Sequence, residues 1–231
     1  MVYLLYTLFM KNAFIHTHPF EVFLHPDTEK IIVGTLPPPR FSTKELKPND
    51  VNFCYGSKDN LLWLALNQIY NLNLEFENTQ DAITQRKEFL IEHRIGICDI
   101  VHSCERIKID ASDIGMQNVV LRNLIGFIEE YKHIHTIIFT GGGSKNGPEY
   151  FLKQQLKTHQ LKLNLLENED VRTHTFTLDN REIITYSLIS PSNAANRFIG
   201  SNKEFKEKRA QNPNYTTFDF RVKQYEKIFK K

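Results

Sequence analysis

The sequence predicts an α/β fold in which three layers, α/β/α, enclose a central, mostly parallel four-stranded sheet. Short apolar segments rich in β-branched residues alternate along the chain with longer segments whose apolar residues recur at helical spacing. This alternation is typical of a parallel sheet with helices on both faces. No repeat or low-complexity linker interrupts it, so we expect residues 1–231 to form a single domain.

Four short apolar segments are expected to form the strands of this sheet. In chain order they are Lys30–Val33, Ile95–Val101, His135–Thr140 and Ile183–Ile189. Their length and composition are typical of strands buried on both faces. The first ends in Gly34, and the prolines of the turn Thr35–Pro39 prevent it from continuing as strand or helix.

The segments with helical spacing are expected to cover the sheet. They are a helix that begins at its N-cap Asp59 and extends to about Ile69, residues 80–93, Asn118–Tyr131, Glu149–Thr158 and a C-terminal helix from about Phe218. In such sheets, ligands bind at the carboxyl ends of the strands. Four segments are therefore expected to meet at one edge of the sheet: Gly34–Pro39, Asp99–Arg106, Thr140–Lys145 and Ser190–Arg197.

The charge of the chain is small but unevenly distributed. Hydrophobic residues make up 41% and charged residues 24%, as in ordinary soluble proteins, and the formal net charge is +2. From Arg197 to Lys231, however, there are ten Lys or Arg and four Asp or Glu. This basic end is compatible with contacts to a phosphate backbone and, more simply, with the solvated face of a helix.

The motifs of several common protein classes are absent from the sequence. The run Gly141–Gly143, followed by Ser-Lys, lacks the spacing of a phosphate-binding loop, and we interpret it as a turn that permits close backbone approach. The nine histidines include no H-E-x-x-H pair, and no G-x-S-x-G elbow is present. We therefore expect no metal, no cofactor and no α/β-hydrolase triad.

The cysteines and the first residues bear on the cellular compartment. Cys54, Cys98 and Cys104 form no C-x-x-C pair, and we expect buried thiols in a reducing cytoplasm. The apolar segment Met1–Met10 has no basic lead and is too short to span a bilayer. We expect residues 1–14 either to pack at the edge of the domain or to extend from it. Neither a membrane nor a protein partner is implied.

Four segments, taken together and in this order, resemble the uracil-DNA glycosylase superfamily. Ile31–Pro38 is similar to its apolar strand followed by G-x-x-P-G, and Tyr55–Trp63 resembles its aromatic-A-H-P-x-N-x-F-W segment. Asp99–Arg106 resembles the W-D-V-x-x-S-C-E-R segment of the hypoxanthine (deoxyinosine) DNA glycosylases, the most similar branch, followed by the mismatch-specific uracil/thymine glycosylases. Ser190–Asn196 resembles the S-P-S-P-x-N loop. The resemblance covers roughly residues 15–230.

The resemblance implies a monofunctional DNA glycosylase that hydrolyses the N-glycosidic bond of deaminated bases, hypoxanthine or uracil, in base excision repair. Its substrate would be DNA with a deaminated or mismatched base, and it would need no cofactor. The chain departs from the pattern at Pro38, which replaces a glycine, at Leu36, which replaces the catalytic asparagine of the mismatch-specific branch, and at Gly56–Asp59, which replaces A-H-P-x. In the hypoxanthine branch the asparagine of the second motif is catalytic, and here that residue is Asn60.

The resemblance also implies roles for the residues that would meet the base. Asn60 would orient the attacking water with its side-chain carbonyl; alternatively, it caps the start of its helix. Tyr55 would stack on the flipped base or, alternatively, belong to the core. Asp99 would accept the ring N–H of uracil or hypoxanthine, or form a salt bridge with Arg106. The turn that completes the base-binding site consists of Gly34, Thr35, Leu36 and Pro37, and the Thr35 and Leu36 backbone N–H groups would stabilise the leaving base.

The last motif would contact the DNA beside the flipped nucleotide. Ser190, Ser192 and Asn193 would bind phosphates, and Asn196 or Arg197 would fill the gap in the base stack. Two other functions stay open. One is a catalytically silent member of the fold that binds nucleic acid, motivated by Leu36 and Pro38. The other is an unrelated α/β enzyme acting on a small nucleotide or sugar.

Overall fold

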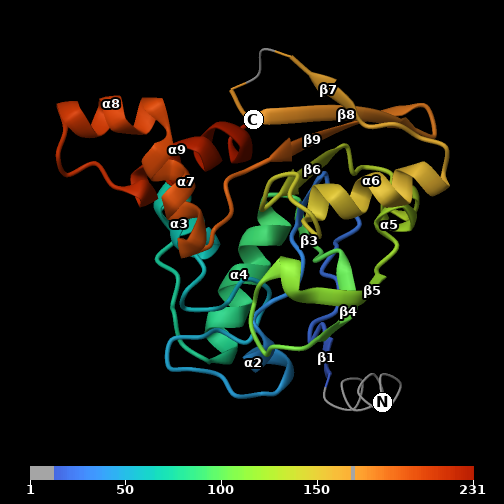
Figure 1. Cartoon of the computed structure of the whole chain (residues 1–231), viewed down its shortest axis with the longest axis horizontal. Helices are drawn as coiled ribbons and strands as arrows, with labels where there is room; N and C mark the ends of the chain where they lie inside the picture. Colours follow the sequence, from blue (N-terminus) through green and yellow to red (C-terminus); the bar gives the residue numbers. More distant parts are fainter. Residues whose placement is uncertain (1–12, 168–169) are drawn as a thin grey trace, which may run out of the picture.

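The computed structural model describes residues 13–167 and 170–231, with a six-stranded sheet at its centre (Figure 1). The strand order is β3-β2-β6-β9-β8-β7. The first four strands run parallel: β3 (Ile95–Ile97), β2 (Lys30–Val33), β6 (Thr136–Phe139) and β9 (Arg181–Ser187). Each overlaps one of the four segments in which the sequence predicts strands, and β9 begins two residues before its predicted start at Ile183.

The prediction of a four-stranded sheet is wrong, because two antiparallel strands extend it. β8 (Arg172–Leu178) pairs with β9, and β7 (Asn164–Leu166) pairs with β8. In β8 the polar side chains of Thr173 and His174 are buried. The strand therefore lacks the apolar pattern by which buried strands are recognised in a sequence.

Helices cover both faces of the sheet, as predicted. Successive side chains of a strand point to opposite faces. Accordingly, Ile32 packs with α3 (Leu62–Tyr70), α4 (Gln80–Glu92) and α9 (Thr217–Phe229). Its neighbours Ile31 and Val33 pack instead with α5 (Leu124–Glu130) and α6 (Pro148–Thr158). Figure 1 shows α5 and α6 together on one side of the sheet.

A second sheet replaces part of two predicted elements. It has three antiparallel strands in the order β1-β4-β5: β1 (Phe14–Thr17), β4 (Val101–Arg106) and β5 (Met116–Leu121). The predicted strand Ile95–Val101 thus ends at Ile97, and Val101 begins β4. The predicted helix Asn118–Tyr131 is wrong in its first half, where the β-branched residues Val119 and Val120 lie in β5; Asn123 then caps α5.

The other helices lie in connections between strands or follow β9. α2 (Pro39–Ser42) follows the turn after β2, and η1 (Asp113–Gly115) precedes β5. After β9 come η2 (Asn193–Ala195), α7 (Asn196–Ser201) and α8 (Lys203–Gln211). The N-cap of α3 is Leu61, not the predicted Asp59, because the Asp59 carboxylate instead lies 3.5 Å from Arg40.

The structure describes the three cysteines but not the apolar segment at the start of the chain. Cys54, Cys98 and Cys104 are free and buried, as predicted. The segment Met1–Met10 lies outside the described residues. Among the described residues, no helix combines the length and the apolarity that crossing a bilayer requires.

Candidate active site

The carboxyl ends of β3, β2 and β6 meet at Gly34. The register places Val33 opposite Phe139, so Gly34 and Thr140 follow on adjacent strands. The Gly34 N–H donates to Oδ1 of Asp99 at 3.1 Å, and the Gly34 carbonyl accepts from the Ile100 N–H at 2.9 Å. These two hydrogen bonds fix Asp99 beside the turn that follows β2.

Tyr55 reaches the same point from the loop before α3. Its hydroxyl lies 3.1 Å from Oγ1 of Thr140. Burial, together with the nearby Asp99 carboxylate, raises the pKa of the Tyr55 phenol well above its ordinary value, so the side chain stays neutral. Tyr55 also has a φ of 58°, in the left-handed region that a bulky residue rarely adopts. Such backbone strain persists only where the surrounding structure enforces it, and it is common at functional sites.

His18 completes this group, although no motif in the sequence includes it. Its Nε2 lies 2.9 Å from Oδ2 of Asp99, and both side chains are buried. The residue follows β1, and its N–H donates to the carbonyl of His102 in β4, so the second sheet positions it. We call Gly34, Asp99, Tyr55, Thr140 and His18 the strand-end cluster.

The alternative of an Asp99–Arg106 salt bridge is wrong. Arg106 donates from Nε to Nδ1 of His16 at 2.9 Å and from Nη1 to the carbonyl of Ser112. Burial, the Arg106 charge and His18 lower the pKa of His16 to about 4, so His16 is neutral at physiological pH. Among the described residues, no group of three His, Cys, Asp or Glu side chains is placed to hold a metal.

The turn after β2 presents free backbone donors. In the described part of the chain, neither the Thr35 N–H nor the Leu36 N–H has a protein acceptor. The Thr35 hydroxyl donates to Oδ1 of Asp113 at 2.7 Å, and burial raises the pKa of the Asp113 carboxyl. The Leu36 side chain packs against the apolar core next to α5 and α6, and Pro37 is buried. The turn therefore directs its apolar side chains inward.

A buried carboxylate anchors the loop that carries Tyr55 and Asn60. Asp50 accepts hydrogen bonds from Nε and Nη2 of Arg40, at 2.7 and 2.9 Å, and from the backbone N–H groups of Lys47 and Lys58. Burial raises the pKa of Asp50, but these hydrogen bonds outweigh that effect and lower it to about 2. The Trp63 indole N–H, which donates to the Cys54 carbonyl at 2.8 Å, holds the loop from the other side.

Asn60 lies next to the last of the predicted motifs. Its Oδ1 accepts the Leu62 N–H at 2.9 Å, so the side chain caps the first turn of α3. Its backbone forms an antiparallel bridge with Ser192, and the Leu61 N–H donates to the carbonyl of Pro191 at 2.8 Å. The capping alternative is thus observed, and the second lone pair of Oδ1 leaves room for a further donor.

Arg221 of α9 holds the segment Ser190–Arg197 in place. We call this segment the 190–197 loop. The guanidinium is fully buried and donates to the carbonyls of Ser190 and Ser192 and to Oδ1 of Asn196, at 3.1 to 3.3 Å. Among the described residues, no carboxylate forms an ion pair with it. Burial lowers the pKa of Arg221, but arginine remains charged in proteins. The sequence predicted this basic helix only as a solvated or phosphate-binding face.

Most lysines of the basic C-terminal end have acidic partners. Glu204 accepts from Lys208 and Lys223, and Lys227 pairs with Asp170. These pairs favour the simpler interpretation of that charge, a solvated helix face, for the lysines involved. Arg197, in contrast, is exposed at the end of the 190–197 loop.

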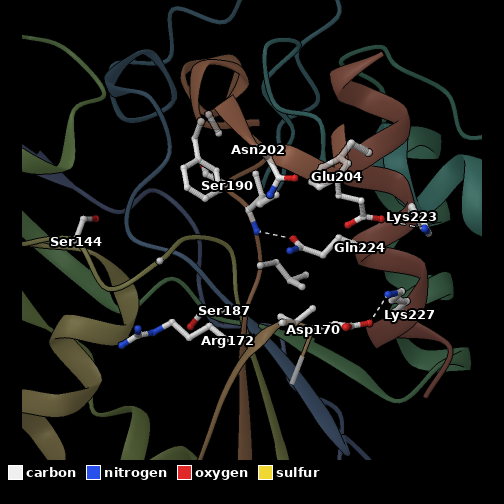
Figure 2. A pocket seen from close by; sticks show the side chains of 17 residues that line it. Ser144, Asp170, Arg172, Ser187, Ser190, Asn202, Glu204, Lys223, Gln224 and Lys227 are labelled. Atoms are coloured by element: carbon white, nitrogen blue, oxygen red, sulfur yellow. Dashed lines mark hydrogen bonds and ion pairs between the residues drawn. The ribbon is translucent and has the colours of Figure 1, made fainter. Parts of the chain in front are cut away.

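A cleft of about 800 Å³ opens beside the 190–197 loop (Figure 2). Figure 2 shows Ser144, Ser187 and Arg172 on one side of it and Lys223, Gln224 and Lys227 of α9 on the other. Oε1 of Gln224 accepts the Ile189 N–H at 2.7 Å, which joins α9 to the residue just before the 190–197 loop. Of the predicted site residues, only Ser190 lines the cleft.

The structure therefore gathers the predicted residues into two groups at one edge of the sheet. Gly34, Tyr55 and Asp99 meet in the strand-end cluster, and Thr35, Leu36 and Pro37 continue from it. Asn60 lies with the 190–197 loop, which contains Ser190, Ser192, Asn193, Asn196 and Arg197. The loop anchored by Asp50 connects the groups, because it carries both Tyr55 and Asn60.

Comparisons with known proteins identify a shared fold. No protein-family model and no curated protein matches the sequence. Among solved structures, a solution NMR structure described as a "putative Uracil DNA glycosylase" from Methanosarcina acetivorans superposes with a TM-score of 0.52. The alignment covers 91% of this chain and 99% of that chain, at 20% sequence identity. At this identity the likeness shows a common fold.

Replacing Asp50 is expected to destabilise the chain. In Asp50→Asn the half-buried Arg40 loses its buried counter-charge, and the free energy of unfolding at pH 7 should fall by about 3 kcal/mol. Because folding lowers the pKa of Asp50 from 3.8 to about 2, its stabilisation is complete above pH 3.8 and is lost as the pH falls through 2. In urea titrations, the difference in free energy of unfolding between wild type and Asp50→Asn should therefore decrease as the pH falls towards 2.

Asp59→Asn is the matched control for this prediction. Asp59 faces the same arginine at 3.5 Å, but its side chain is 58% exposed, so its removal should change stability by less than about 1 kcal/mol. Equal losses in the two variants would contradict the anchoring role of Asp50.

Adding a methyl group at position 34 is expected to disrupt the strand-end cluster. A Cβ on Gly34 would lie 2.3 Å from the Tyr55 hydroxyl and 2.7 Å from Oδ1 of Asp99, so both side chains must move. Gly34→Ala should lower the free energy of unfolding by about 1 to 3 kcal/mol in urea titrations. In the control Gly142→Ala, the new Cβ has no atom within 4 Å, and stability should stay near that of wild type.

Proposed function

We propose that this protein is a monofunctional DNA glycosylase that hydrolyses the N-glycosidic bond of deaminated bases, hypoxanthine or uracil, in base excision repair. One observation carries the proposal: Gly34, Asp99 and Tyr55, which three separate motifs of that superfamily single out, converge at the carboxyl edge of the sheet. The Gly34 N–H donates to Asp99, and the Tyr55 hydroxyl and Oδ1 of Asp99 both lie within 3 Å of where a Cβ on Gly34 would be. The fold shared with the archaeal structure supports it.

The strand-end cluster has the chemistry to recognise a flipped base. A nucleotide must leave the base stack before its glycosidic bond becomes accessible, and the base then needs a stacking surface and hydrogen bonds to its edge. Tyr55, half-buried and neutral, offers the stacking surface. Asp99 would accept the ring N–H of uracil or hypoxanthine and repel the bare ring nitrogen of cytosine or adenine.

Bond cleavage requires stabilisation of the leaving base and delivery of water. As the C1′–N bond breaks, its electron pair moves to the base, and the free Thr35 and Leu36 N–H groups would donate hydrogen bonds to the base carbonyl that gains this charge. The water oxygen then bonds to C1′, and a water proton neutralises the base. Asn60 is a neutral amide and no strong base, so its role would be to orient this water through the free lone pair of Oδ1.

The 190–197 loop would hold the DNA on either side of the flipped nucleotide. The loop exposes Ser192 and Asn193, and Ser190 lines the adjacent cleft. The buried charge of Arg221 lies directly beneath, without an acidic partner in the described part of the chain, and makes the loop favourable for phosphate. Asn196 or Arg197 would fill the gap in the base stack.

A catalytically silent nucleic-acid-binding protein of the same fold is the second candidate. Two observations favour it: Leu36, where the mismatch-specific branch has its catalytic asparagine, packs against the core, and Oδ1 of Asn60 already caps α3. Salt-sensitive DNA binding without release of any base would identify this function.

The test is strand scission by alkali after incubation with oligonucleotides that contain uracil, hypoxanthine, xanthine or mismatched thymine. Wild type should release uracil or hypoxanthine. Asn60→Ser keeps a side-chain oxygen that caps α3 but withdraws the amide, so excision should fall at least about 100-fold while the thermal unfolding temperature stays near that of wild type.

Two outcomes would contradict these assignments separately. Full activity of Asn60→Ser and Asn60→Ala would show that Asn60 only caps its helix. A wild-type protein that binds DNA but leaves every base of the panel in place would replace the glycosylase proposal with the binding function.

A further inference from the structure

His18 is a buried side chain that the proposed reaction does not yet use. It lies 2.9 Å from Oδ2 of Asp99, although 81 positions separate the two residues in the sequence. Its side chain and that of Asp99 are at least nine-tenths buried. Burying a polar pair costs desolvation free energy, so a buried pair at the edge where ligands bind suggests a function for His18.

Both ring nitrogens of His18 are already engaged. Nδ1 lies 2.9 Å from the carbonyl oxygen and 3.1 Å from the backbone N of Phe20, while Nε2 lies 2.9 Å from Oδ2 of Asp99. We assign the donor in the hydrogen bond to Asp99 to the Nε2–H, because carboxylate oxygens are acceptors. His18 therefore has no free nitrogen with which to take a proton from water, and it acts through Asp99.

This hydrogen bond helps to fix the orientation of Asp99. With Nε2–H on Oδ2 and the Gly34 N–H on Oδ1, each carboxylate oxygen has one donor from the protein. Two donated hydrogen bonds, one to each oxygen, prevent rotation of the carboxylate, so its remaining lone pairs keep fixed directions.

We propose that His18 is a positioning residue that holds Asp99 in a single orientation, so that Asp99 accepts the ring N–H of a flipped base. The inference rests on the proposed function, because it gives His18 a part in that same base recognition. The backbone at Phe20 holds the His18 ring at Nδ1, and the Gly34 N–H binds the other oxygen of Asp99. Recognition of the base thus depends on β1 and the second sheet as well as on the strand ends.

The experiment compares His18→Leu with His18→Gln. Leucine removes the donor, whereas the glutamine amide places an N–H near the position of Nε2. Under single-turnover conditions, His18→Leu should lose about 10- to 100-fold in the rate of uracil or hypoxanthine excision, the effect of removing a hydrogen bond to a charged group. His18→Gln should recover most of that rate.

Affinity for DNA with an abasic-site analogue separates positioning from general damage. This ligand has no base for Asp99 to meet, so its dissociation constant should be the same for wild type, His18→Leu and His18→Gln. Equal losses in excision rate and in this affinity would overturn the inference in favour of a structural role.

NMR of the ¹⁵N-labelled histidine rings gives an answer that does not depend on activity or on a folded variant. In the wild type, Nε2 of His18 should carry a proton, and an Nε2 without a proton would overturn the inference even in an active enzyme. An active wild type whose excision rate is unchanged in His18→Leu would overturn this inference alone. A wild type inactive on every base would overturn the proposed function and, with it, this inference.

Discussion

The whole carboxyl edge of the sheet depends on the absence of a side chain at position 34. The Tyr55 hydroxyl, Oδ1 of Asp99 and Oγ1 of Thr140 all lie within 3.0 Å of where a Cβ would be, so three segments pack against one backbone unit. Gly34 does not have a positive φ, so the glycine is required only because the three side chains approach its backbone closely. The Gly34 N–H then becomes a donor to Asp99, and His18 is held through Asp99 in turn.

Buried charges at this edge are held by several hydrogen bonds each. Asp50 has an arginine partner, whereas Nε and Nη2 of Arg221 donate to backbone carbonyls and to Asn196. Desolvation of such groups costs free energy, and the cost is offset only when the geometry is well satisfied. The consequence is that the loops carrying Tyr55, Asn60 and Ser192 are rigidly attached to the scaffold. Preorganised polar groups of this kind are what a site needs to act on developing charge.

The sequence was informative where residues are buried in regular patterns and much less so elsewhere. The four parallel strands could be predicted because both of their faces are apolar, whereas β8 escaped notice because Thr173 and His174 point inward. Gly34, Tyr55 and Asp99 could be singled out because each belongs to a local motif. His18 and Arg221 could not, because their hydrogen bonds join residues tens of positions apart, and no local pattern records a long-range contact.

Two of the three departures from the superfamily pattern are connected in space. Pro38, which replaces a glycine, is the N-cap of α2, and Pro39 follows it as a helix-initiating residue. That helix carries Arg40, whose guanidinium donates to Asp50 and, at 2.7 Å, to the hydroxyl of Ser57.

Ser57 and Asp59 are themselves departures, since they lie in the segment that replaces A-H-P-x. Arg40 thus links the altered first motif to the altered second motif and holds the loop that carries Asn60. Two unrelated losses would favour a silent protein. The changes at Pro38, Ser57 and Asp59 instead meet in one hydrogen-bonded network around Arg40, which weakens the argument from Pro38 for a silent protein.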